Sequence, residues 1–459
     1  MSGMNETHSS GGEFALQEDW WSVILGICIV GVAYVSFVLG GSLNWFAVAP
    51  VPWSTQSDLT AQLARDAPRY LVQFATLLAL FTLVARALGQ DARSFAAGFV
   101  IVYAVSFAIL VIGAQELPQL YSVEPPLIAL AAGMLIGNLT RPPERLSEAF
   151  RVEFYIKIGV VLLGATMPLT LLLWAGPIAV AQASIVSIVT FLVIYRTAGF
   201  LELDRKLGAL LAVGGAICGV SAVIAIAGAI RARREHMSIA ITSVVLWSIA
   251  MILVLPLLAR AWYLPASIGG AWIGTSEFAD AAGFVAAQTY GAIARSGAVA
   301  GTPDQALWAY TLLKVVGRDP WIGIWAVVLS FMAVTRWDAT TPRGHVSLMD
   351  IWRRFPKFIL GLFAASLLAT FASHDFSYAE YDTLVRPAFI APLANLRVWV
   401  FTFSFLSIGL TTRLRGLSRI GGEAFIAFAT GVLVNVVIGF LLSAVVFQSY
   451  WLQLGAGPL

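Results

Sequence analysis

The stretch LGALLAVGGAICGVSAVIAIAGAI, residues 207–230, is uncharged, and Gly214, Gly215 and Gly219 interrupt its centre. It is about as long as a membrane-spanning helix, which needs roughly 20 apolar residues. An unpaired amide in hydrocarbon costs several kcal/mol, so a lipid-facing helix keeps its backbone hydrogen-bonded. The interruption therefore predicts unwound backbone that faces protein or a polar cavity. Discontinuous helices of this kind form the midplane sites of many secondary transporters.

A second interruption, GTSEFADAAG at residues 274–283, follows about one helix downstream. It carries the hydroxyl groups of Thr275 and Ser276 and the carboxyl groups of Glu277 and Asp280. Ionisable residues inside membrane segments are functional-site hypotheses by default, because burying them costs free energy. The two interruptions together favour a transporter over a structural membrane anchor.

The composition places the chain among polytopic membrane proteins. It has 459 residues, of which 59% are hydrophobic and 12% charged, whereas a soluble domain carries roughly a quarter charged residues. The net charge of +3 is spread over loops, which gives no support to nucleic-acid binding. The two cysteines and four histidines do not cluster, so we expect no metal and no cofactor.

Thirteen hydrophobic segments recur along the chain, and several are cut by Gly or Pro. We expect an all-α polytopic membrane protein with about 11–13 hydrophobic segments, depending on whether the two interrupted segments cross the bilayer or turn back. The segments are 21–40, 70–88, 94–113, 124–139, 157–174, 177–196, 207–230, 236–259, 267–295, 305–336, 356–373, 395–412 and 421–448. We read residues 21–40 as a retained first helix after a polar tail.

Basic residues concentrate in alternate loops. By the positive-inside rule, this pattern places the N-terminus in the cytoplasm and the C-terminus outside. Arg231, Arg233 and Arg234 follow the first interrupted segment directly. If residues 207–230 cross the membrane, these arginines face outward against the rule, and if the segment is re-entrant they stay inside. Both readings remain open.

Five residues recur 245 positions further along the chain. Gly164, Thr166, Leu169, Gly176 and Ala179 match Gly409, Thr411, Leu414, Gly421 and Ala424. The charge pattern gives the two copies opposite orientations, so they predict an inverted repeat, a hallmark of secondary transporters. Coincidence between two apolar helices is the alternative.

The first candidate site consists of Gly214, Gly215, Cys218, Gly219 and Ser221. Glycine lets the chain leave helical geometry at little steric cost, and freed amides at a helix N-terminus attract an anion. Ser221 and Cys218 would add side-chain contacts. Close packing of small residues between helices is the alternative, but the adjacent glycine pair and Gly219 exceed what such packing needs.

The second candidate site begins with Gly274, Thr275 and Ser276. Glu277 and Asp280 stand three residues apart, so they would share a helix face. We expect these two acids to bind a proton or cation coupled to transport. A loop in which the acids are merely solvated is the alternative.

Two lysines lie at or within hydrophobic segments, Lys157 at the start of one and Lys314 inside another. A buried ammonium group would compensate an anionic substrate or neutralise one of the nearby acids. For Lys157 we favour a side chain that extends to the membrane interface. Lys314 is followed by Arg318 and Asp319, and both a buried and an interfacial position remain open for it.

The sequence lacks the motifs of metalloproteases, serine hydrolases and nucleotide-binding loops. We therefore expect a protein that is not an enzyme and that draws on an ion or proton gradient rather than on a nucleotide.

Four stretches resemble the sulfate exporter (YeiH-like) family. They are GGAICGVSA at 214–222, GTSEFADAAGFVAA at 274–287, ALWAYTLLKVVGRDPW at 306–321 and FTFSFLSIGLTTRLRGL at 401–417. The likeness covers roughly residues 120–450, and the glycine-cysteine motif is its most specific part. It implies a bacterial inner-membrane protein related to bile-acid and arsenite transporters, with inverted repeats and crossed, broken helices.

The resemblance also carries site residues. Gly214, Gly215, Cys218 and Gly219 fit the glycine-cysteine motif, Gly274, Thr275 and Ser276 fit the start of the second motif, and Lys314 fits the family's lysine. The chain departs from the family after that start. The family often has a His-Glu pair where Phe278 and Ala279 or their neighbours stand, so no role of that histidine carries over.

We therefore expect a secondary active transporter that moves a small anion. The family name implies export of sulfite or sulfate across the inner membrane. A sodium- or proton-coupled transporter of a small organic anion is the first alternative, and an anion channel is another. The expected partners are the anion, H+ or Na+ and the lipid bilayer, with a homodimer left open. The expected regions are a cytoplasmic tail (1–19), N-terminal helices (20–119) and a transporter core (120–459).

Overall fold

The computed structural model describes residues 10–115, 125–140, 143–167, 169–337, 352, 355–377, 380–412 and 421–454. These residues are almost all helical, and they form no strand beyond an isolated bridge between Trp53 and Gln115. The predicted all-α fold is therefore confirmed. Eight of the described helices are long and apolar enough to cross a membrane: Glu18–Val38, Gln56–Ala87, Ala92–Gly113, Leu169–Phe200, Arg234–Ala261, Pro303–Met332, Thr383–Thr411 and Gly422–Val446. The chain is a multi-pass membrane protein.

Both interrupted segments are split into two shorter helices. The first segment gives α9 (Arg205–Ala216) and α10 (Val220–Ala229), and the second gives α12 (Ala266–Ser276) and α13 (Asp280–Arg295). The four helices have 12, 10, 11 and 16 residues. Each is shorter than the roughly 20 residues that a helix needs to span the hydrocarbon core.

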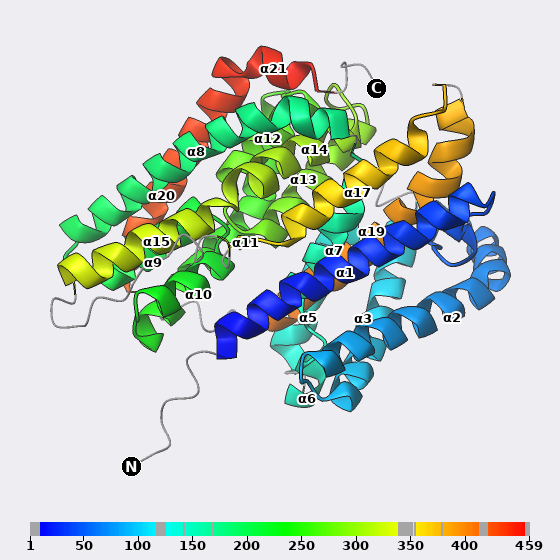
Figure 1. Cartoon of the computed structure of the whole chain (residues 1–459), viewed down its shortest axis with the longest axis horizontal. Coiled ribbons are helices and arrows are strands. Elements are labelled where there is room, and N and C mark those ends of the chain that lie inside the picture. The colour runs from blue at the N-terminus through cyan, green and yellow to red at the C-terminus, as the bar shows by residue number, and fades with distance from the viewer. Residues whose placement is uncertain are drawn as a thin grey trace. The chain divides into compact units, whose positions relative to one another are not determined.

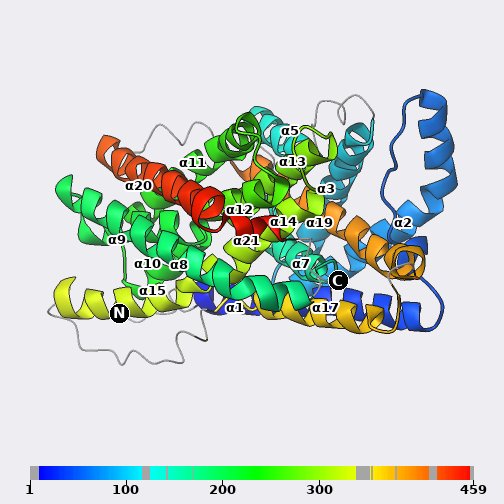
Figure 2. The same ribbon diagram turned by 90° about the horizontal axis from the view of Figure 1, so that it is seen from above.

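The chain forms two compact units, and the first is built from residues 1–16, 173–356 and 414–458. Within it α12, α13 and α14 lie side by side, as Figures 1 and 2 show. Beside the four half-length helices, the described elements of this unit are α8 (Leu169–Phe200, from residue 173 on), α11 (Arg234–Ala261), α14 (Pro303–Thr311), η2 (Leu312–Arg318), α15 (Trp321–Met332), η3 (Ala333–Trp337), α20 (Gly422–Phe440), η6 (Leu441–Val446) and α21 (Gln448–Leu452).

The second unit contains residues 17–172, 357–413 and 459. Its described elements are α1 (Ser10–Val38, from residue 17 on), η1 (Leu43–Trp45), α2 (Gln56–Ala87), α3 (Ala92–Gly113), α5 (Pro125–Thr140), α6 (Glu144–Ser147), α7 (Val152–Gly164), α17 (Phe358–Ser373), η4 (Tyr381–Ile390) and α19 (Ala391–Thr411). Its core is rich in aromatic side chains, and Trp399 of α19 stacks on Tyr103 of α3 with ring centroids 4.7 Å apart.

Helix α1 begins at Ser10, within the stretch that the sequence predicted as a polar tail. Two acids near its start, Glu18 and Asp19, form ion pairs with Arg151 and Lys157 of the same unit. Attraction to a paired cation offsets part of the free energy that burying an acid costs. This pairing accounts for the continuation of the helix through charged positions ahead of the apolar span.

The predicted repeat lies partly outside the described residues, because Leu414 is not among them. The chain passes from the second unit to the first after residue 172 and again after residue 413, and both passages fall within or beside a copy of the repeated pattern. The first glycine of each copy makes a close backbone approach, Gly164 to Leu362 and Gly409 to Leu130 and Met134. The inverted repeat stays a prediction.

Helices α5 and α19 pack with their backbones in close approach, and this contact yields a stability prediction. A methyl group at Gly409 would lie 2.5 Å from the backbone nitrogen of Met134, and the backbone cannot move aside as a side chain can. Overpacking of this kind costs about 1–3 kcal/mol. We expect Gly409→Ala to lower the thermal unfolding midpoint of the detergent-solubilised protein.

The matched control for this substitution is Gly31→Ala in α1, where an added methyl group meets nothing within 4 Å. That variant should unfold at the wild-type temperature or slightly above it, since alanine is the better helix former. Equal midpoints for the two variants would contradict the close approach between α5 and α19.

Candidate functional site

The first break lies between α9 and α10, at Ile217, Cys218 and Gly219. Ile217 leaves helical geometry at φ −124° and ψ −111°, and Gly219 has φ +69° and ψ −122°. This second conformation disfavours any residue with a Cβ atom, so glycine is required there. The first described intrahelical bond of α10 runs from the Val223 N–H to the Gly219 carbonyl. The amides of the first turn of α10 therefore precede the helical ladder and are available to a ligand.

The second break lies between α12 and α13, at Glu277, Phe278 and Ala279. Glu277 and Ala279 are extended, with φ −80° and ψ 127° and φ −97° and ψ 125°. The Glu277 side chain is buried, and its Oε1 atom accepts a hydrogen bond from the Ala279 N–H at 3.0 Å. A carboxylate at this position also faces the favourable N-terminal end of the α13 dipole.

The two breaks touch each other. A methyl group added at Gly219 would lie 3.2 Å from the Cα atom of Ala279. This contact brings the starts of α10 and α13 together, so two sets of N-terminal amides converge at one place. The sequence predicted that the two interrupted segments form the site together, and the structure places their breaks in contact.

A third element, η2, brings two buried cations to the breaks. Residues Leu312–Arg318 form a π-helix, and the Asp319 N–H donates to the Lys314 carbonyl five residues earlier at 3.0 Å. Lys314, Arg318 and Asp319 are all at most 1% exposed. Single turns of π-helix inside longer helices occur frequently at functional sites.

Arg318 connects the C-terminal ends of α9 and α12. Its Nε atom donates to Ala216 O at 2.8 Å and an Nη2 hydrogen bond goes to Gly215 O. Its Nη1 atom donates to Thr275 O at 2.8 Å and Glu277 O at 3.2 Å. The last four carbonyls of an α-helix have no partner within the helix. A single guanidinium group therefore caps both broken helices.

Lys314 connects the first break to two carboxylates. Its Nζ atom donates to Ile217 O at 2.8 Å and to Asp319 Oδ1 at 3.0 Å, and it lies 2.6 Å from Asp280 Oδ1. Lys314 therefore donates to one carbonyl and one carboxylate and forms an ion pair with a second carboxylate. The lysine neutralises Asp280, one of the two roles that the sequence allowed for it.

Small and polar residues hold the second break against neighbouring helices. Asn435 of α20 donates from Nδ2 to Ser276 O at 3.0 Å, and the hydroxyl of Thr275 donates to carbonyls of its own helix. A methyl group at Gly439 would lie 2.7 Å from the hydroxyl oxygens of Thr275 and Ser276. Asn435 therefore acts between helices, as expected for a lone amide in a membrane protein.

The remaining glycines predicted for the site make close contacts with neighbouring elements. A methyl group at Gly214 would meet Val244 and Val223, and one at Gly215 would meet Ile194. One at Gly274 would lie 2.9 Å from the Tyr310 carbonyl of α14. These three glycines are explained by packing, whereas Gly219 is explained by its backbone conformation. Cys218 is buried and Ser221 is half-buried at the start of α10.

Sequence reasoning missed Arg318 and Asp319 as members of the site and treated them only as neighbours of Lys314. In an α-helix, residues three or four apart share a face and residues five apart do not. The π-helix changes this spacing, so Asp319 comes back to Lys314. The signal was the run KVVGRD at 314–319, which puts three charges into a segment otherwise apolar enough to span a membrane.

Lys157 is placed elsewhere, in α7 of the second unit. Its Nζ atom lies 2.6 Å from Asp19 and 3.7 Å from Glu153, and its side chain is 12% exposed. Its described charge partners are therefore these two acids. The interfacial position favoured from sequence stays a prediction.

Three side chains that could bind a metal ion lie close together near the breaks. The ammonium group of Lys314 already lies between two of them. One ligand atom each from Cys218, Asp280 and Asp319 lies within 4.8 Å of the others. The Lys314 ammonium is bound between the two carboxylates. We assign no metal to this position, because the lysine supplies the charge that an ion would bring.

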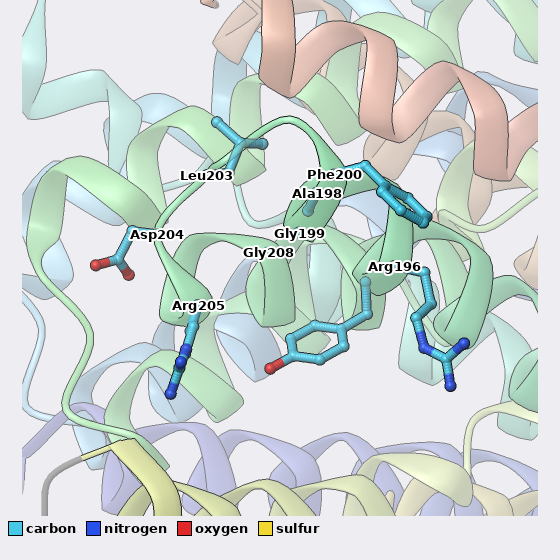
Figure 3. Close-up of a pocket in the computed structure, with 9 residues that line it drawn as sticks. Arg196, Ala198, Gly199, Phe200, Leu203, Asp204, Arg205 and Gly208 are labelled. Carbon is cyan, nitrogen blue, oxygen red and sulfur yellow. The ribbon is translucent and has the colours of Figure 1, made fainter.

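A surface pocket of about 350 Å³ lies at the corner between α8 and α9. Figure 3 shows Arg196 on one side of it and Asp204 and Arg205 on the other. The Asp204 carboxylate accepts from the Lys206 and Leu207 amides and so caps the start of α9. This pocket is at the opposite end of α9 from the break, and we do not include it in the site.

Comparisons with known proteins identify relatives of the chain. A family model described as conserved hypothetical protein 698 matches residues 97–428, which include both breaks and η2. A UPF0324 membrane protein of Rhodopirellula baltica is 30% identical over 411 residues, which are 88% of this chain and 72% of that protein. One of Nitrosomonas europaea is 29% identical and covers 92% of this chain and 93% of its own length.

A third relative, from Nitratidesulfovibrio vulgaris, is 32% identical over 78% of this chain, which spans only 61% of that protein's length. No solved structure matches the chain. The family match covers well over half of the sequence, and the three relatives share one printed name. The chain therefore belongs to the family described as conserved hypothetical protein 698, and it is similar to the proteins called UPF0324 membrane proteins.

Proposed function

We propose that this protein is a secondary active transporter of a small anion. One observation carries the proposal: the contact between Gly219 and Ala279 brings two interrupted helices together at their breaks. Paired discontinuous helices whose half-helix ends face each other are the arrangement that transporters use to bind substrates and ions within the membrane.

The chemistry of the site favours an anion at the convergent N-termini of α10 and α13. Helix N-termini carry partial positive charge and unpaired N–H donors. Lys314 and Arg318 are already occupied by carbonyls and carboxylates. In this proposal the backbone amides therefore contact the substrate, Ser221 adds a hydroxyl, and the two cations position the breaks.

The substrate class follows from the resemblance found in the sequence. An inorganic sulfur oxyanion, sulfite or sulfate, is our first candidate, exported across a bacterial inner membrane with the N-terminus in the cytoplasm and the C-terminus in the periplasm. A small organic anion coupled to sodium or protons is the second candidate. Saturation of flux at low substrate concentration would separate either transporter from an anion channel.

Gly219→Ala is the substitution that tests the proposed site. It forces an L-residue to φ +69° and brings a methyl group to 3.1 Å from Val244 and 3.2 Å from Ala279. A backbone conformation this sparsely populated costs a residue with a Cβ atom about 1–3 kcal/mol, and each 1.4 kcal/mol is about tenfold in a rate constant. We expect flux of sulfite or sulfate into proteoliposomes to fall about tenfold or more.

Gly228→Ala in α10 is the matched control, because an added methyl group there meets nothing within 4 Å. It should transport at the wild-type rate. Wild-type protein that moves neither sulfite, sulfate nor a small organic anion under imposed pH and sodium gradients would overturn the proposed function. Equal flux in the two alanine variants would show that the breaks do not form the substrate site.

A further inference from the structure

Two positions suited to bound cations are filled by side chains of the protein itself. In discontinuous-helix transporters, carbonyls at unwound segments and half-helix C-terminal ends coordinate sodium. Here four such carbonyls accept hydrogen bonds from Arg318, and the Ile217 carbonyl accepts from Lys314. The carbonyl oxygens that would coordinate a sodium ion thus already accept hydrogen bonds from Arg318 and Lys314.

The charges at the breaks do not balance when every group is ionised. Glu277, Asp280 and Asp319 bring three negative charges, and Lys314 and Arg318 bring two positive ones. All five residues lie in or beside the breaks, and four of them are at most 1% exposed. An uncompensated charge in such surroundings is costly, and a carboxylate there takes up a proton instead. Binding of one proton would therefore make the cluster neutral.

Asp280 and Asp319 are the two acids of the cluster that share one cation. The described donors of Arg318 all go to backbone carbonyls, and a single ammonium group, that of Lys314, serves both aspartates. Two carboxylates that share one site do not both ionise readily, because their like charges repel. The Oδ2 atom of Asp319 is fully buried and has no hydrogen-bond partner among the described residues. Glu277 Oε2 and Asp280 Oδ1 are buried in the same way, but only the two aspartates share one ammonium group, so Asp319 Oδ2 is in position to carry that proton.

We infer that Asp280 and Asp319 form a proton-binding site and that a proton, not sodium, is the ion coupled to transport. The identity of the coupled ion rests on the proposed function, whereas the proton-binding site does not. A proton joins one carboxylate oxygen to give a neutral carboxyl group, and it leaves to water by the reverse step. Asp280, with a 12% exposed side chain, is the member of the pair that can meet water first.

Other titratable groups lie around the pair formed by Asp280 and Asp319, on elements that pack against it. Glu277 lies at the second break and Cys218 at the first, and the Tyr310 hydroxyl of α14 donates to the Asp280 carbonyl at 2.8 Å. Arg318 lies one residue before Asp319. The bound proton is assigned to the two aspartates alone. The protonation states of these other groups stay unchanged when it leaves.

Difference infrared spectroscopy of the purified protein in nanodiscs tests the proton site without any transport measurement. Wild-type protein should show a carboxylic-acid C=O band at neutral pH that disappears in strong base. Asp319→Asn leaves two acids facing two cations, so the charges balance without a proton, and the band should vanish. Glu423→Gln removes an exposed acid of the same unit and should leave the band intact. A wild-type spectrum without the band, or a band that survives in both Asp280→Asn and Asp319→Asn, would overturn the proton site.

The sodium half of the inference has its own measurement. Sodium chloride should leave the thermal midpoint of the wild-type protein where choline chloride leaves it, because Lys314 and Arg318 already occupy the cation positions described at the breaks. A midpoint that rises with sodium but not with choline or potassium would overturn this half. If the infrared band behaves as expected and no anion is transported under any gradient, the proposed function fails while the proton site stands.

Discussion

Arg318→Met is expected to remove most of the folded protein from detergent extracts. The substitution keeps a long apolar side chain but leaves the carbonyls of Gly215, Ala216, Thr275 and Glu277 without their donor. A buried polar group without a partner costs about 1–3 kcal/mol, and removing one member of a buried charge cluster costs about 3–5 kcal/mol. Natural proteins are stable by only about 5–15 kcal/mol, so this loss is severe.

The measurement is the fraction of monodisperse protein that survives a temperature ramp. Arg260→Met provides the matched control, since Arg260 is exposed at the end of α11 in the same unit. It should behave like wild type. Arg318→Lys keeps the charge, but one compact ammonium group cannot reach four carbonyls. The stability of this variant should therefore fall between those of Arg318→Met and Arg260→Met. A methionine variant as stable as the Arg260 control would show that Arg318 does not hold the half-helix ends together.

The fold could be predicted from sequence where one residue type or one length decides the structure. Long apolar runs predicted the membrane-spanning helices, and the interruptions at residues 214–221 and 274–283 predicted two breaks. Gly219 shows why this works, because only glycine adopts its backbone conformation easily. The continuation of α1 through Glu18 and Asp19 was missed, since the ion pairs of these acids are formed with residues more than a hundred positions away.

The site could be predicted only in part. Glu277, Asp280 and Lys314 stood out as charges in apolar segments, which is a local signal. The capping role of Arg318 requires the ends of α9 and α12 to meet, and no pattern within either helix reports that meeting. The pairing of Lys314 with Asp319 depends on the π-helical spacing of η2, and no pattern in the sequence predicted a π-helix there.

Lys314→Met should destabilise the protein strongly, and removing an acid should rescue it. The wild-type cluster has one negative charge in excess, and the methionine variant has two, so it must take up a second proton or unfold. Breaking a buried ion pair costs about 3–5 kcal/mol. We expect a correspondingly large fall of the free energy of unfolding, measured by denaturant titration in detergent.

The double variants Lys314→Met/Asp319→Asn and Lys314→Met/Asp280→Asn return the cluster to the wild-type excess of one negative charge. We expect each to recover part of the lost stability, with a coupling free energy of about 0.5–3 kcal/mol in a double-mutant cycle. Lys314→Met/Glu423→Gln removes an exposed acid instead and should recover nothing. Equal rescue by all three second substitutions would indicate a general effect of net charge. Rescue confined to the two aspartates would tie the stability of the breaks to the ammonium that both carboxylates share.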